Sequence, residues 1–391
     1  MGWKLSAAAK RIVCASGSAP AGGTCAATVV FDMNAVCRRE FIWKSHDVPP
    51  AEAVAIFWRR HVATHPAATQ FYFAFDSADR IPDVRRTYLA ETRYANRAET
   101  HCNPFDARQM QNTWAEVWAS ATAKEAMWDL VAACLHAHAR QMGAPGVQYT
   151  IDPPCGAILR CPARDGPLHF SRFGEADLKA ALFAAEHAVG ETLLFTIDWD
   201  MVVQGAAVLP VAATLDMGAI WEKDGERYYS KRNAPAKAAR VRERLRPALM
   251  PIGDRLSYAF LLLAAGGVDY CDGLKGYGYR EPDMVRLLAE PGEPFIATAG
   301  TRFTFDVDAF VRRLAPVKAV RARCKDIEKL RAEIRRMWYC LLYFALVGRW
   351  AERGGPRTIT DNFFPGAATA QAALTSTGNL PVVYVDNDAG L

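Results

Sequence analysis

The sequence lacks the marks of several protein classes. No apolar run reaches the roughly 18 residues that a membrane-spanning helix needs. The ten cysteines include no CxxC pair and no Cys/His cluster at zinc-ligand spacing, which argues against a conventional zinc motif and favours a reducing compartment. No internal repeat recurs at a fixed period. We therefore expect an intracellular protein with no membrane attachment and no secretory leader.

Charge is unevenly distributed along the chain. The net charge of +5 is small for 391 residues. Basic residues nevertheless cluster at 231–246 and at 312–336. Such clusters suit the phosphate backbone of a nucleic acid, although a solvated helix face would explain either cluster taken alone.

Three apolar, β-prone runs are closed or followed by carboxylates. These runs cover residues 27–32, 71–76 and 192–197, and helical sequence at 50–63 separates the first two. The acids at their ends are Asp32, Asp76, Asp198 and Asp200. Strand, helix and strand in this order predict an α/β fold with a parallel sheet, in which ligands bind at the carboxyl ends of the strands. We therefore expect these acids to share one edge of the sheet.

A predicted helix start supplies two further acids. Residues 173–181 open an Ala-rich helix with Glu175 and Asp177 in its first turn, where the helix dipole favours negative charge. Helix capping would explain one of them, whereas a first turn that faces a metal ion would present both. The preceding stretch, 149–171, is rich in Pro, Gly and Cys, and we expect an irregular insertion without recognisable chemistry.

The most specific stretch is GGVDYCDGLKGYG at 266–278. It places Asp269 ahead of a Gly-x-Gly turn, Gly276 to Gly278, and of a helix that can begin near Glu281. Glycines two apart let backbone amides converge on an anion, and the helix N-terminus adds positive partial charge. An ordinary loop between helices is the alternative interpretation.

Seven carboxylates emerge as candidate metal ligands. They are Asp32, Asp76, Glu175, Asp177, Asp198, Asp200 and Asp269. Packed together they would repel one another, so their convergence would require divalent cations, and oxygen ligands favour Mg²⁺ or Mn²⁺ over zinc. Two such ions suit phosphodiester hydrolysis without a side-chain nucleophile. Turn and cap formation explains any one of these acids, but not the strand ends and motifs together.

In the order and the residues of these motifs, the chain resembles the flap endonuclease family of structure-specific 5′ nucleases. The resemblance covers roughly residues 1–290. It rests on collinear stretches at residues 1–5, 30–32, 74–77, 174–181, 196–200 and 267–278. The last of these resembles the helix-two-turn-helix of the family, placed at about 258–290. Two positions depart from the family pattern: Asp177 stands where Glu is usual, and Arg38 falls near a customary stacking aromatic.

The resemblance implies a PIN-like α/β core with a helical arch. The nuclease domain would cover residues 1–345, and residues 346–391 would form a partly disordered C-terminal extension. The arch would come from residues 81–141, and its arginines would contact the scissile phosphate; these are Arg85, Arg86 and Arg93. Further contacts to nucleic acid are implied for Gly2, Arg38, Lys275, Gly276 and Gly278. The helix-two-turn-helix would grip duplex, with K⁺ as an additional ion.

The function implied is that of a nuclease using two Mg²⁺ ions, with Mn²⁺ as a substitute, on branched or nicked double-stranded DNA at 5′ flaps, nicks or ends. Such an activity belongs to DNA repair and replication, and so to the nucleus. An RNA-degrading endonuclease on the same scaffold stays open, because metal chemistry at the phosphate does not depend on the sugar. A catalytically silent nucleic-acid-binding relative is the third alternative. The tail contains no clear sliding-clamp-binding motif.

Overall fold

The computed structural model describes the chain in a series of separate stretches. These are residues 7–14, 26–37, 48–76, 121–163, 168, 175–196, 198, 200–208, 213–216, 221–228, 235–237, 239–242, 245–246, 250, 252–268, 271, 273–274, 282–290, 292–299, 302–314, 317, 330, 333–334, 337–338, 340–341, 344 and 382–385.

The largest described sheet has six strands in the order β4-β3-β2-β1-β5-β6. The strands are β1 (Thr28–Asp32), β2 (Gln70–Ala74), β3 (Gln148–Asp152), β4 (Leu159–Cys161), β5 (Thr192–Phe195) and β6 (Ala213–Asp216). All neighbours run parallel except β4, which pairs antiparallel with β3. The predicted parallel α/β sheet is therefore confirmed, with β1 as a central strand.

Strand β1 shows why these runs fold as central strands. All five of its residues are buried, which is expected where helices cover both faces of a parallel sheet. Side chains alternate between the faces. Phe31 stacks on Phe73 and Phe195 on one face, with ring centroids 5.2 and 4.9 Å away. On the other face Tyr72 stacks on Phe183 at 4.1 Å.

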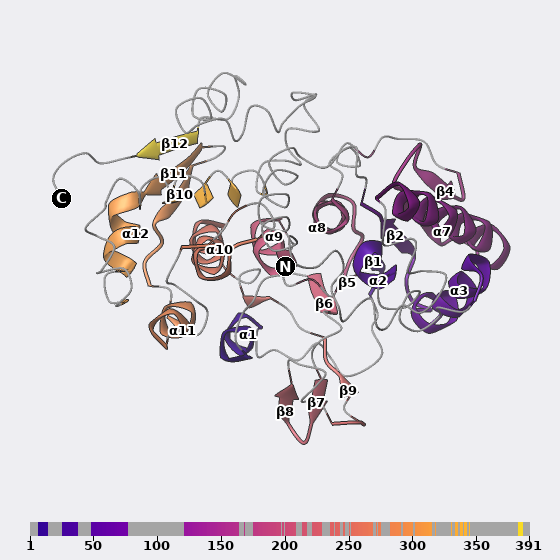
Figure 1. Cartoon of the computed structure of the whole chain (residues 1–391), viewed down its shortest axis with the longest axis horizontal. Helices are drawn as coiled ribbons and strands as arrows, with labels where there is room; N and C mark the ends of the chain where they lie inside the picture. The colour runs from indigo at the N-terminus through magenta and orange to yellow at the C-terminus, as the bar shows by residue number, and fades with distance from the viewer. Residues whose placement is uncertain are drawn as a thin grey trace, which may run out of the picture.

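Helices cover both faces of the sheet (Figure 1). One face carries α3 (Pro50–Phe57), the π-helical turn η2 (Trp58–Val62) and α7 (Ala121–Met142). The other carries α8 (Ala176–Glu186) and α9 (Asp200–Val208), with α10 (Ile252–Gly266) packed outside α9. The short helix α2 (Met33–Cys37) contacts β1 and β2, whereas α1 (Ala7–Val13) contacts the helix at Pro282–Ala289.

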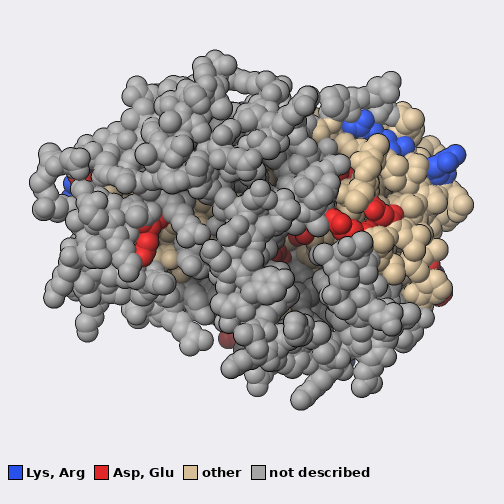
Figure 2. All heavy atoms as spheres, turned by 45° about the horizontal axis from the view of Figure 1, so that its top comes forward, with Lys and Arg blue, Asp and Glu red and all other residues tan. Residues whose placement is uncertain are grey.

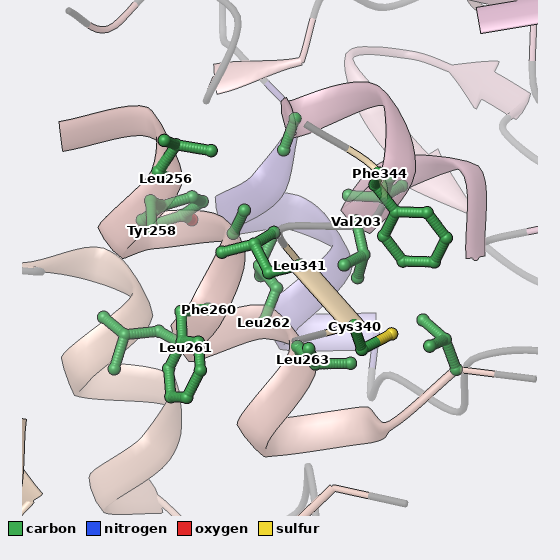
Figure 3. Close-up of a cluster of buried hydrophobic side chains, with 14 of the residues drawn as sticks. Val203, Leu256, Tyr258, Phe260, Leu261, Leu262, Leu263, Cys340, Leu341 and Phe344 are labelled. Carbon is green, nitrogen blue, oxygen red and sulfur yellow. The ribbon is translucent and has the colours of Figure 1, made fainter. Parts of the chain in front are cut away.

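Helix α10 is the centre of a second packed region. Its residues from Leu256 to Ala265 are all buried, and they pack with Val203 of α9 and with Leu341 and Phe344 near the C-terminal end (Figure 3). A helix that is apolar all round belongs in an interior. This region holds α10 in contact with the helix that carries Asp200.

Two small sheets and two helices accompany α10. Strands β10 (Ile296–Ala299) and β11 (Arg302–Asp306) form an antiparallel hairpin, and β12 (Val382–Val385) pairs parallel with β11. Helix α12 (Val307–Leu314) lies beside this sheet (Figure 1), whereas α11 (Pro282–Ala289) packs against α10 and α1. The other sheet contains β7 (Trp221–Lys223), β8 (Glu226–Tyr228) and β9 (Ala239–Arg240). Part of the predicted C-terminal extension, 346–391, thus takes part in a sheet.

One expectation about local structure was wrong. The stretch 149–171 is not simply an irregular insertion, because it contributes most of β3 and all of β4 to the main sheet. Strand β6 begins at Ala213, after α9 has ended at Val208. Helices α10 and α11 lie where the helix-two-turn-helix was predicted, whereas residues 275–281 between them are outside the described part. Over the described ranges, no helix combines the length and apolarity needed to cross a membrane.

Candidate functional site

Six of the seven candidate acids lie within the described residues, and they belong to one edge of the main sheet. Asp32 is the last residue of β1, and Asp76 follows the end of β2. Asp198 follows β5, and Asp200 begins α9. Glu175 and Asp177 stand at the start of α8. The expectation that strand ends would bring these acids to a common edge agrees with the sheet topology.

Asp32 is the most deeply placed of these acids. Only 3% of the residue is exposed. The Thr196 hydroxyl donates to its Oδ2 over 2.8 Å, and the Ala35 amide donates to its Oδ1 over 3.2 Å. Burial raises the pKa of Asp32 well above its ordinary value, and the negative charges of Asp177 and Asp76 raise it further, against the opposing effect of the two hydrogen bonds. Acids from three separate elements therefore repel one another here.

Asp76 is fixed by the amino terminus of α8. The Ala176 amide donates to Asp76 Oδ1 over 2.7 Å. The first amides of a helix have no partner within the helix, so a carboxylate from another element can accept from them. Glu175 occupies the residue before the helix but makes no side-chain capping bond, and it is buried. We expected Glu175 or Asp177 to cap this helix. The acceptor for the Ala176 amide is instead the side chain of Asp76.

The loop after β5 connects its two acids to Asp32. Thr196 Oγ1, which donates to Asp32, accepts a hydrogen bond from the Asp198 amide over 3.1 Å. Asp198 Oδ1 in turn accepts from the Asp200 amide over 3.0 Å. Thr196 was not among the predicted residues, although its position directly after a buried strand is a signal that could have identified it. Its hydroxyl therefore links the end of β1 to the loop after β5 through two hydrogen bonds.

Asp177 is held from the neighbouring helix. Gln204 of α9 donates from Nε2 to Asp177 Oδ2 over 2.5 Å. Gln204 is only 2% exposed, and its Oε1 has no hydrogen-bond partner among the described residues. A lone polar residue inside the apolar sequence MVVQGAAV was the available signal for this contact. Helices α8 and α9 are therefore joined directly at the acidic edge.

A buried ion pair lies behind the acids, and sequence reasoning missed it. Lys179 Nζ lies 3.3 Å from Asp152 Oδ1 and donates to the Phe75 carbonyl over 3.0 Å. The Tyr72 hydroxyl donates to Asp152 Oδ2 over 2.8 Å. The pKa of Tyr72 is well above its ordinary value, because of burial first and then the neighbouring Asp152. Asp152 ends β3 as Asp32 ends β1, and this repeated pattern was its signal.

The chemistry of the acids can be compared with what a metal ion requires. Their carboxylate oxygens are the donor type that Mg²⁺ and Mn²⁺ prefer. Within the described stretches, however, no group of three or more His, Cys, Asp or Glu residues forms an arrangement that could hold a metal ion. Asp269 lies outside these stretches. The donors thus fit the predicted ions by type, and the two-ion arrangement stays a prediction.

The remaining predicted residues also lie outside the described part of the chain. They are Gly2, Arg38, Arg85, Arg86, Arg93, Lys275, Gly276 and Gly278. Described residues near the glycine turn form a close-packed end to α10. Gly267 has a φ of 66°, which favours glycine, and a Cβ on Gly273 would lie 2.7 Å from the Ala264 carbonyl oxygen.

The described surface shows an uneven distribution of charge. On the face drawn in Figure 2, acidic side chains gather near the middle of the right half, and Lys and Arg side chains lie further out along the upper right. In this view the basic side chains therefore lie to one side of the acidic group.

Comparisons with known proteins found similarity among solved structures. No protein-family model matches the sequence, and no curated protein matches it. Among solved structures, the chain is similar to the catalytic core of Rad2 in complex with DNA substrate, at 14% sequence identity and a TM-score of 0.34. The match covers 90% of this chain and 88% of that chain. This likeness assigns no role to any residue here.

Proposed function

We propose that the protein is a divalent-metal-dependent, structure-specific nuclease that hydrolyses phosphodiester bonds of DNA at 5′ flaps, nicks or ends. The observation that supports this most is the approach of Asp32, Asp76 and Asp177, whose mutual repulsion contributes to the raised pKa of Asp32. A divalent cation bound among these acids would offset their repulsion and allow all three to be ionised near neutral pH.

The metal-holding residues in this proposal are the acids of the sheet edge together with the acid near the glycine turn. They are Asp32, Asp76, Glu175, Asp177, Asp198, Asp200 and Asp269. When bound, two Mg²⁺ or Mn²⁺ ions would activate a water and stabilise charge on the scissile phosphate. The chain itself orients the ligands: Thr196 holds Asp32, the Ala176 amide holds Asp76, and Gln204 holds Asp177.

The nucleic-acid contacts in this proposal come from a PIN-like arch and a helix-two-turn-helix. Arg85, Arg86 and Arg93 would contact the scissile phosphate, while Gly2 and Arg38 would bind near the cut. The Gly276 and Gly278 amides with Lys275 would hold duplex further away, with K⁺ as a bridging ion. These contacts are to phosphates, so binding should depend steeply on salt and little on sequence.

Cleavage of matched substrates tests the proposal. The full chain is incubated with a 5′-flap DNA and with a single-stranded RNA of equal length, in Mg²⁺, in Mn²⁺ and with a chelator. We expect flap cleavage that needs the metal and is lost in Asp76→Asn. Glu52→Gln, an exposed position in the first turn of α3, is the matched control and should cleave normally.

Other outcomes would redirect the proposal. Intact DNA with degraded RNA would favour the RNA-degrading alternative. Binding of both nucleic acids without metal-dependent cleavage of either would favour a silent relative. Activity that survives in Asp76→Asn would come from another site or from a contaminant.

A further inference from the structure

The ammonium group of Lys179 is buried in the protein interior. The residue has no solvent-exposed surface, and it lies on α8 two positions after Asp177. A lysine in an interior must be paired, because removing its charge from water is costly. Asp152 provides that partner, 3.3 Å away. The pair lies just behind the acidic edge of the sheet.

Lys179 and Asp152 together hold the peptide that leads into Asp76. Strand β2 ends at Ala74, so Phe75 lies beyond the regular strand pairing. The Phe75 amide donates to the Asp152 carbonyl over 3.1 Å, and the Phe75 carbonyl accepts from Lys179 Nζ over 3.0 Å. Both polar groups of this residue are therefore occupied by neighbours from β3 and α8.

Asp76, the next residue, is held by the same helix. Its Oδ1 accepts from the Ala176 amide, one turn before Lys179 on α8. The residue pair Phe75 and Asp76 is thus bound to α8 at two points, through the main chain and through the side chain. Loss of the Lys179 contact would leave the Phe75 peptide held through its amide alone, so the main chain that carries the Asp76 carboxylate would be less firmly fixed.

Stability alone does not explain why a charged pair is placed here. Replacing a buried ion pair by apolar residues of similar volume is often neutral or stabilising, whereas removing one partner is strongly destabilising. An apolar pair could fill the same space, but it could not donate a hydrogen bond to the Phe75 carbonyl. That contact is the property specific to Lys179.

We propose that Lys179 is a positioning residue for Asp76, which it orients by fixing the Phe75 carbonyl behind the acidic edge. This inference rests on the proposed function, because it gives Asp76 its role as a metal ligand. Residues that orient metal ligands typically change metal affinity by about 10- to 100-fold when they are replaced.

Two variants separate positioning from stability. Lys179→Met leaves the Asp152 carboxylate buried without its cation, and we expect a large loss of thermal stability. The double variant Lys179→Met with Asp152→Asn removes both charges, so most of that stability should return. Tyr72→Phe is the control, because it removes one hydrogen bond to Asp152 and leaves the contact between Lys179 and Phe75 in place.

Mn²⁺ titration calorimetry and hydrogen exchange are the readouts. In the double variant, Mn²⁺ should bind about tenfold more weakly or worse, and the amides at the start of α8 should exchange faster. The Tyr72→Phe variant should match the wild type in both. Wild-type Mn²⁺ affinity and wild-type exchange in the folded double variant would overturn the inference alone.

Failure of the proposed function would look different. If the wild type bound no Mn²⁺, the proposed metal site would be wrong. Lys179 would then have no metal ligand to position. If, in addition, exchange at the start of α8 were unchanged in the double variant, the mechanical link from Lys179 to Asp76 would also be refuted.

Discussion

Gln204 Nε2 donates to Asp177 Oδ2, so that α9 holds an acid carried by α8. The contact is buried on the glutamine side and partly exposed on the aspartate side. Because the donor is an amide, it stabilises the ionised form of the carboxylate without adding charge.

Replacing this amide should affect stability and pH dependence in distinct ways. Gln204→Met keeps the volume and removes the donor, and we expect a loss of about 1 kcal/mol in the free energy of unfolding. Gln204→Glu places a second carboxylate against Asp177 and should be more destabilising at pH 8 than at pH 5, where protonation relieves the repulsion. Urea unfolding at both pH values measures this. Equal losses for the two variants at pH 8 would contradict the contact.

The raised pKa of Asp32 predicts how stability without metal depends on pH. Because the folded protein retains this proton at pH values where the unfolded chain has lost it, stability is fully present below the unfolded pKa and is lost as pH rises through the folded pKa. Asp32→Asn should therefore stabilise the metal-free protein near pH 8 and change little near pH 4.

Melting temperatures of wild type and Asp32→Asn across this range provide the measurement. The difference between the two proteins should grow with pH. Mg²⁺ should raise the melting temperature of the wild type and have a much smaller effect on Asp32→Asn, because a neutral amide is a poorer ligand for a hard cation. If the difference in melting temperature between the two proteins did not vary with pH, burial and repulsion would not raise the pKa of Asp32.

Ser257 provides a test of the α10 region. Its buried hydroxyl accepts from the Phe295 and Ile296 amides, at 3.2 and 3.0 Å. Ser257→Ala removes one atom and leaves two main-chain donors without this acceptor, which should cost about 2 kcal/mol. Urea unfolding should show a much smaller effect for Thr64→Ala, whose hydroxyl bond to Arg60 is exposed. Similar losses of unfolding free energy in the two variants would argue against the role of Ser257 as the acceptor for both amides.

The sequence predicts the parts of the fold that are encoded locally. Strands β1, β2 and β5 are continuous apolar runs, and each is closed or followed by an acid that marks where it ends. Strand β3 was missed because its sequence, QYTID, is partly polar and proline and glycine lie around it. Its burial comes from the strands and helices that pack on it.

Contacts within the candidate site were harder to predict. Lys179 in a helix is expected to be exposed, and only the fold brings it to Asp152, 27 positions away. Thr196 reaches Asp32 across 164 positions. No local pattern encodes such pairs, whereas the acids themselves were recognisable because they recur after strands and at a helix start.

The order of the strands accounts for the location of the site independently of its side chains. Following the chain from β1, the next strands are added on one side, through β2 to β3, and β5 and β6 are then added on the other. The connections accordingly lie on opposite faces, with α3 and α7 on one and α8 and α9 on the other. Such a reversal opens a crevice between diverging loops at the carboxyl ends of the two strands. The seam between β1 and β5 is therefore the place in the sheet where the topology alone would favour a ligand-binding crevice, and the candidate acids lie at that end of the strands.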